Sequence, residues 1–145
     1  MTTWNSLGFY AIWLVLITIC YSDIRYRIIS NKQVIVLLII ILLNYFLGHA
    51  ELSYFSAIIA LVIGIVLFYI GAVGAGDVKL ISVLLLSIPS NEISDFLVIM
   101  ALLGIPLALI ALIKKIRTKT KTTIPYGVAI SLSYIIITSQ ILYIN

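Results

Sequence analysis

The chain has 145 residues, of which 63% are hydrophobic and 10% are charged, with a formal net charge of +4 and a mean hydropathy of +1.27. A soluble domain carries about 25% charged residues, so this composition excludes an ordinary soluble enzyme and indicates a single integral membrane domain over residues 1–145. Because Cys20 is the only cysteine, the chain has neither an internal disulfide nor a paired-cysteine metal site.

Six apolar segments approach the roughly 20 residues that a helix needs to cross a membrane. No basic residue precedes the first segment and no small-residue cleavage site follows it, so we interpret it as a retained span rather than a secretory signal. The fourth segment is the weakest, since Pro89 interrupts it early, and five spans is the alternative. The sequence predicts an all-α polytopic membrane helix bundle with spans over about 4–22, 33–48, 55–73, 77–89, 95–113 and 124–143.

The basic residues gather at the first, third and fifth junctions between these segments, whereas the other loops hold His49 and acidic residues but no Lys or Arg. With six spans, all three basic junctions lie on one side of the membrane. The positive-inside rule makes that side cytoplasmic, which places both termini on the non-cytoplasmic side. The nine basic residues are Arg25, Arg27, Lys32, Lys79, Lys114, Lys115, Arg117, Lys119 and Lys121.

The basic run 114–121 has two interpretations. Binding of anionic lipid or nucleic acid is one, and a solvated cytoplasmic loop that sets the topology is the other. No aromatic residue interleaves the charges, so nothing indicates base stacking. We favour the solvated loop, expect anionic lipid headgroups beside the basic cytoplasmic loops, and predict no nucleic-acid partner.

Two aspartates fall on the predicted cytoplasmic side, Asp23 after the first span and Asp77 at the start of the fourth. A carboxylate at membrane depth is costly and is therefore a functional-site hypothesis. Two neighbouring carboxyl groups can share one proton, so that one takes a proton from water while the other polarises a carbonyl. Such a pair needs neither a metal nor a cofactor. The alternatives are an ion pair of Asp23 with Arg25 or Arg27 and a helix cap at Asp77.

Glycines around Asp77 favour the catalytic interpretation, in the stretch GAVGAGDVK over residues 71–79. Gly74 and Gly76 permit backbone conformations that are closed to other residues and let another chain approach closely. A protease must let an extended peptide lie against its backbone. A small-residue contact between helices is the alternative.

The sequence at 74–77, Gly-Ala-Gly-Asp, matches the GxGD signature of intramembrane aspartic proteases, and GAGDVKL resembles its longer form in type IV prepilin peptidases. Residues 23–31, DIRYRIISN, are similar to that family's Asp- and Arg-containing block after a membrane span. Residues 124–129, IPYGVA, resemble a third block. The resemblance implies a bacterial inner-membrane aspartic endopeptidase without cofactors. Its partners would be prepilins and pseudopilins, whose basic, glycine-ended leaders it would cut at the cytoplasmic face.

The same resemblance implies a role for individual residues. It makes Asp23 and Asp77 the catalytic pair, Gly74 and Gly76 a supporting turn, and Lys79 an electrostatic neighbour of the pair. Pro125 would begin the sixth span, and for Tyr126 and Gly127 closure of the site and structural packing are both open. The supporting or substrate-approach residues are Gly74, Gly76, Lys79, Arg25, Asn31, Pro125, Tyr126 and Gly127.

The sequence also departs from the family pattern. Ser30 stands where the family usually has proline, so we expect a softer turn before Asn31. Larger members carry a cytoplasmic insertion with paired cysteines and also N-methylate the mature pilin. This chain lacks both features and resembles the short branch associated with tight-adherence (Flp) pili, so methyltransferase activity is not predicted. A proton- or ion-coupled transport protein and a non-catalytic subunit of a pilus or secretion assembly are the rival functions.

Overall fold

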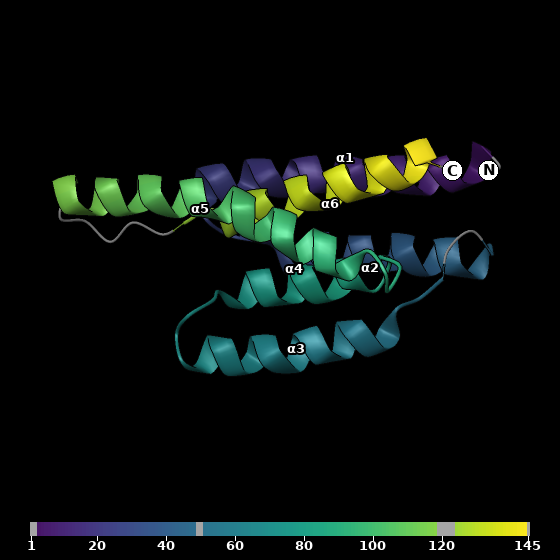
Figure 1. The fold of residues 1–145 in the computed structure, drawn as a ribbon, viewed down its shortest axis with the longest axis horizontal. Coiled ribbons are helices and arrows are strands. Elements are labelled where there is room, and N and C mark those ends of the chain that lie inside the picture. Colours follow the sequence, from purple (N-terminus) through teal and green to yellow (C-terminus); the bar gives the residue numbers. More distant parts are fainter. Residues whose placement is uncertain (1–2, 49–50, 119–123, 145) are drawn as a thin grey trace.

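The computed structural model describes residues 3–48, 51–118 and 124–144, and over these residues the chain forms six helices and no strand. Each predicted span corresponds to one helix, which confirms the all-α class (Figure 1). The helices are α1 (Thr3–Tyr26), α2 (Asn31–Phe46), α3 (Tyr54–Tyr69), α4 (Ala75–Leu85), α5 (Ile93–Thr118) and α6 (Tyr126–Ile144).

The helices pack as an elongated bundle. Both termini lie at one end, and the α3–α4 connection and the end of α5 lie at the other (Figure 1). Helix α1 packs against α2 and α6, and α5 packs against α6. Helix α4 is central, because it contacts α2, α3 and α6, whereas α3 packs mainly against α4.

The core lies where α1, α4 and α6 meet. Leu16, Leu80 and Leu84 are fully buried there, as is Tyr134. The Tyr134 hydroxyl lies 2.9 Å from Ser87 Oγ, so its polar atom is satisfied inside the apolar core. This bond ties α6 to the turn that follows α4, and such hydrogen bonds across a bundle help to hold it together where the hydrophobic effect between helices is weak.

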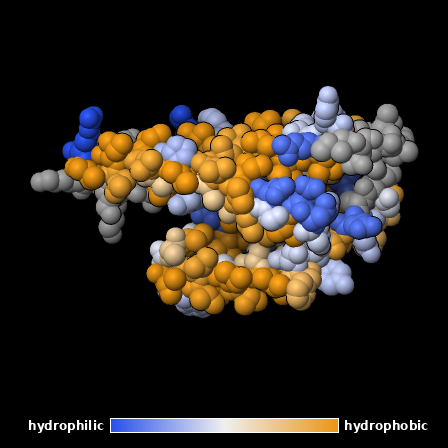
Figure 2. Space-filling view, viewed as in Figure 1, coloured by the Kyte–Doolittle hydropathy of each residue, from blue (hydrophilic) through white to orange (hydrophobic). Residues whose placement is uncertain are grey.

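The outer surface is strongly apolar. Hydrophobic side chains cover α3 and the projecting part of α5 (Figure 2), and Val62, Val66, Leu109 and Ile110 are each more than half exposed. An apolar surface of this extent suits contact with lipid chains. The protein is therefore a membrane protein.

Helix length limits which elements cross the membrane alone. Helices α1, α5 and α6 contain stretches long and apolar enough to do so, over 7–26, 93–113 and 126–143. Helices α2 and α3 are apolar but have 16 residues each, and α4 has 11, which gives it a length of about 16 Å. Six spans and the side of the termini therefore stay predictions.

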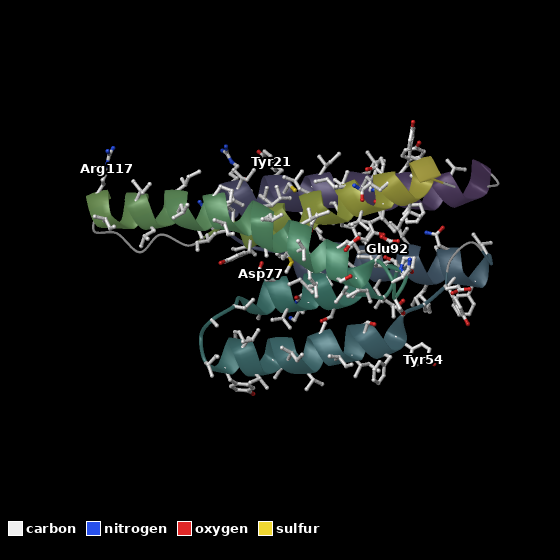
Figure 3. All side chains as sticks on the ribbon, in the orientation of Figure 1. Tyr21, Tyr54, Asp77, Glu92 and Arg117 are labelled. Atoms are coloured by element: carbon white, nitrogen blue, oxygen red, sulfur yellow. The ribbon has the colours of Figure 1, made fainter. Side chains whose placement is uncertain are left out.

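Basic Arg117 and acidic Glu92 lie far apart along the bundle. Figure 3 shows Arg117 toward the end of the molecule where α5 ends, and Glu92 away from that end. Of the basic run, Arg117 is exposed, whereas Lys119 and Lys121 lie outside the described residues. Contact of the basic loops with anionic lipid headgroups stays a prediction.

Candidate active site

Asp23 lies in the last turn of α1, rather than after the helix, and only 5% of its surface is exposed. Helix α1 ends after Tyr26 because Arg27 adopts a left-handed conformation with φ of 56°. The Arg27 backbone N–H still donates a hydrogen bond to the Asp23 carbonyl at 3.1 Å. The carboxyl group is thus fixed by helical backbone and directed into the bundle.

The start of α6 lies against the Asp23 carboxyl group. The backbone N–H groups of Gly127 and Val128 hydrogen-bond with it, while its Oδ2 atom is buried without a hydrogen-bond partner among the described residues. A Cβ atom on Gly127 would lie 2.8 Å from that Oδ2 atom, so any larger residue would require the Asp23 carboxyl group or the start of α6 to shift. Gly127 therefore packs directly against the Asp23 carboxyl group.

Asp77 is the third residue of α4 and is partly buried. The N-cap of the helix is Gly74, so Asp77 is not the cap that the alternative interpretation required. Its carboxyl group hydrogen-bonds with the Gly74 backbone and interacts electrostatically with the Asp23 carboxyl group. The carboxyl groups of Asp77 on α4 and Asp23 on α1 are therefore close enough for their charges to interact.

The two glycines before Asp77 allow neighbouring side chains to lie close to the backbone. A Cβ atom on Gly74 would lie 2.9 Å from Asp77 Oδ2, and one on Gly76 would lie 3.0 Å from Ile29 Cβ. Neither glycine has a positive φ, whereas Gly71 in the same connection has a φ of 76°. The unusual backbone conformation therefore belongs to Gly71, and Gly74 and Gly76 provide space.

Ile29 joins the three parts of the site and was not singled out from the sequence. Its Cβ atom faces Gly76, and its Cδ1 atom lies 3.1 Å from the position of a Cβ on Gly127. The side chain is thus wedged between the starts of α4 and α6. Its only sequence signal is its place between Asp23 and Asn31, within the block that resembles the family.

The turn that carries Ile29 is held by side-chain hydrogen bonds. Ser22 Oγ donates to the Ile28 carbonyl at 2.8 Å. Ser30 is the N-cap of α2 and forms a capping box, in which its hydroxyl accepts from the Lys32 N–H and Gln33 Oε1 accepts from the Ser30 N–H. Serine at this position therefore caps a helix where a proline would rigidify the turn.

Of the remaining predicted residues, Lys79, Asn31 and Arg25 have exposed side chains. Lys79 Nζ donates a hydrogen bond to Asn31 Oδ1 at 3.1 Å, which links α4 to the start of α2 on an exposed surface. The Arg25 guanidinium lies over the Tyr26 ring at 5.8 Å from its centroid. Pro125 directly precedes α6, which begins at Tyr126.

A cavity of about 160 Å³ opens beside Asp77. Its walls are otherwise apolar, apart from Tyr126 at the start of α6. The cavity leaves space beside the Asp77 carboxyl group, within a mostly apolar lining. The lining residues are Ala72, Val73, Asp77, Ile81, Met100, Tyr126 and Ile130.

The model of the type IV leader peptidase family matches residues 10–109. The chain belongs to this family. The match spans both Asp23 and Asp77, and ends within α5, before Pro125, Tyr126 and Gly127. No curated protein and no solved structure matches the chain.

Membership of the type IV leader peptidase family implies that the chain is a protease. Leader peptidases cleave a peptide bond, and the matched part of this chain contains both acidic side chains, Asp23 and Asp77, and most of the residues that line the cavity beside Asp77. The α6 residues beside Asp23 lie beyond the match, so the structure, and not the family match, places them there.

Proposed function

We propose that the chain is a membrane aspartic endopeptidase that removes the leader from Flp-type prepilins and related pseudopilins at the cytoplasmic face of the bacterial inner membrane. The observation that carries this proposal is the convergence of Asp23 and Asp77, from separate helices, at one partly desolvated centre of a leader peptidase. The basic residues at the predicted cytoplasmic junctions support the orientation.

The chemistry follows from the surroundings of the two carboxyl groups. Asp23 faces the N–H groups of Gly127 and Val128, donors that suit a carboxylate, so we assign it the role of general base. Asp77 lines the cavity, so we assign it the shared proton and the role of donating that proton to the carbonyl oxygen.

In this mechanism a water molecule attacks the scissile carbonyl carbon while Asp23 takes its proton. Asp77 protonates the carbonyl oxygen, which gives a neutral tetrahedral intermediate. Collapse of the intermediate breaks the C–N bond, with the proton on Asp23 passing to the leaving nitrogen and the hydroxyl proton returning to Asp77. The products are a leader with a new carboxyl terminus and a mature chain with a new amino terminus.

The test is co-expression with a Flp-type prepilin, followed by separation of the precursor and mature forms. We expect Asp23→Asn and Asp77→Asn each to abolish processing, because each removes one carboxyl group of the pair. Asp95→Asn is the matched control, since Asp95 is an exposed acidic residue in the first turn of α5. Processing by either variant of the pair would instead favour a non-catalytic assembly subunit or a transport protein.

A further inference from the structure

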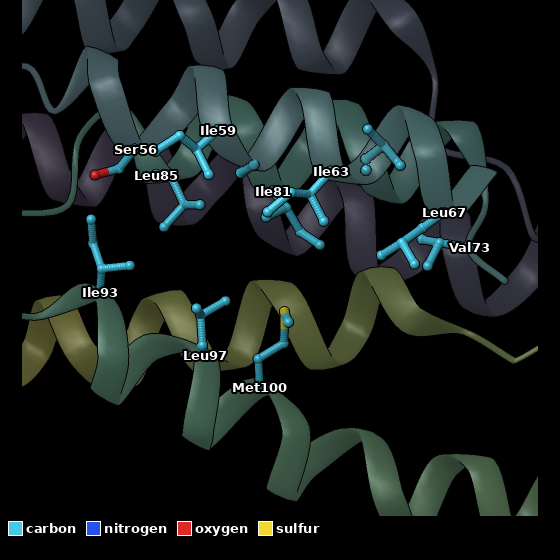
Figure 4. Close-up of a pocket in the computed structure, with 13 residues that line it drawn as sticks. Ser56, Ile59, Ile63, Leu67, Val73, Ile81, Leu85, Ile93, Leu97 and Met100 are labelled. Carbon is cyan, nitrogen blue, oxygen red and sulfur yellow. The ribbon is translucent and has the colours of Figure 1, made fainter. Parts of the chain in front are cut away.

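A larger apolar groove lies between α5 on one side and α3 with α4 on the other (Figure 4). Its volume is about 370 Å³, and Ser56 is the only polar side chain among the residues that line it. Leu97 and Met100 of α5 face Ile63 and Ile81 across the gap (Figure 4). No step of the proposed reaction uses this groove.

The groove exists because α3 and α5 pack against other helices and not against each other. Helix α3 packs closely against α4 at Gly64, where an added Cβ atom would clash with Val78 Cγ1. Helix α5 packs against α6 instead. The facing sides of α3 and α5 are therefore left as an apolar channel along α4.

The channel leads to the candidate active site. Val73, Ile81 and Met100 line both the groove and the smaller cavity that contains Asp77. At its other end the groove is lined by Ser56 and Ile93, near the starts of α3 and α5. The groove thus has a catalytic end and a distal end.

We propose that this groove seats the membrane-inserted helix of the substrate, with the scissile junction at Asp77. The inference rests on the proposed function, since a prepilin joins a polar leader directly to an apolar segment. When the junction reaches Asp77, the apolar segment must continue from that point into the membrane. The groove is the apolar surface continuous with Asp77, and aliphatic side chains of a helix match its lining.

The geometry also sets a direction and a length. The substrate helix runs parallel to α4 and antiparallel to α3 and α5, because its leader end lies at the start of α4. Leu67 and Ser56 are 11 residues apart on α3 and both line the groove, which corresponds to about 16 Å of helix. About the first dozen residues after the cleavage site therefore lie in the groove.

Blocking the groove tests the proposal. Ile63→Trp and Leu97→Trp fill it, whereas Val62→Trp and Val98→Trp place the same side chain one position along, outside the groove. Ile63 and Val62 are the better-matched pair, with 54% and 56% of their surfaces exposed. We expect the groove variants to slow cleavage of full-length prepilin in vesicles by roughly tenfold or more, the effect expected from overpacking a contact surface. The controls should retain the rate of the unmodified chain.

A second substrate separates the groove from the chemistry. A short peptide that spans the junction but lacks the apolar segment does not need the groove, so its cleavage should be equal in the groove variants and their controls. Equal losses in groove and control variants, or equal losses on both substrates, would overturn the proposal. If the unmodified chain cleaves no prepilin, the proposed function itself fails.

Disulfide crosslinking gives a readout that does not require cleavage. In a Cys20→Ala, Asp23→Asn chain, Leu67→Cys should crosslink to a substrate cysteine just after the cleavage site, and Ser56→Cys to one about eleven residues later. The outward-facing Val62→Cys should give neither product. Absence of crosslinks, a reversed order, or equal crosslinking at Val62→Cys would overturn the proposal and indicate a groove filled by lipid chains.

Discussion

Gly127 at the start of α6 lies against Asp23 in the last turn of α1, so that a Cβ atom on the glycine would be 2.8 Å from Asp23 Oδ2. This relationship brings together two of the sequence blocks that resemble prepilin peptidases, residues 23–31 and residues 124–129. It also places the start of α6 at the candidate site, although the family match ends within α5.

We expect Gly127→Ala to slow prepilin processing at least roughly tenfold, because the methyl group displaces the Asp23 carboxyl group or the start of α6. Overpacking should also lower the free energy of unfolding by about 1–3 kcal/mol. Processing assays and thermal unfolding in detergent measure the two effects. Gly104→Ala is the control, since its Cβ would lie at an ordinary 3.5 Å from Tyr126. Normal processing by Gly127→Ala would show that the close approach has no functional role.

Ile29→Ala should reduce both stability and processing, because the wedge between the starts of α4 and α6 is lost. For a partly buried isoleucine we expect a cost of about 1–3 kcal/mol. Ile28→Ala is the matched control, as Ile28 is the preceding residue and is 62% exposed. Equal effects of the two substitutions, measured by thermal unfolding and precursor processing, would contradict the role given to Ile29.

Lys79 and Asn31 should act as a coupled pair. Because Lys79 Nζ donates to Asn31 Oδ1 on an exposed surface, we expect a coupling free energy of only about 0.5–1 kcal/mol in a double-mutant cycle. Lys79→Met, Asn31→Ala and the double variant supply the cycle, with unfolding as the measurement. Strictly additive effects would show that the hydrogen bond contributes nothing to stability.

Ser30→Ala should destabilise α2 by about 1 kcal/mol, because the N-cap hydrogen bond is lost. Ser30→Pro should still fold, since Ser30 has a φ of −72°, which proline adopts without strain. Thermal unfolding of both variants, with Ser94→Ala on an exposed surface as the control, measures the effect. Failure of Ser30→Pro to fold would show that the Ser30 N–H bond to Gln33 is indispensable.

The sequence predicted the helices well because runs of apolar residues are direct consequences of membrane burial. The pairing of Asp23 and Asp77 in one catalytic site, expected from the glycine pattern and the family resemblance, stays a prediction. The short length of α4 was foreseen from Pro89, although the helix ends at Leu85, before that proline.

What the sequence did not predict depends on contacts between distant segments. Ile29 resembles any other aliphatic residue until Gly76 and Gly127 are placed against it. Gly74 and Gly76 were expected to permit unusual backbone conformations, yet the positive φ in that connection belongs to Gly71. The groove likewise arises from the separation of α3 and α5, which no local pattern encodes.

The central claim is that Asp23 and Asp77 act as one catalytic unit, and the rate of prepilin cleavage by the purified chain in vesicles tests it most directly. We predict that Asp23→Asn, Asp77→Asn and the double variant fall to the same background, at least about a thousandfold below the unmodified chain, because residues that act as a unit are not additive. The variants should keep their thermal unfolding transitions. Cleavage at an undiminished rate by either single variant would contradict the account.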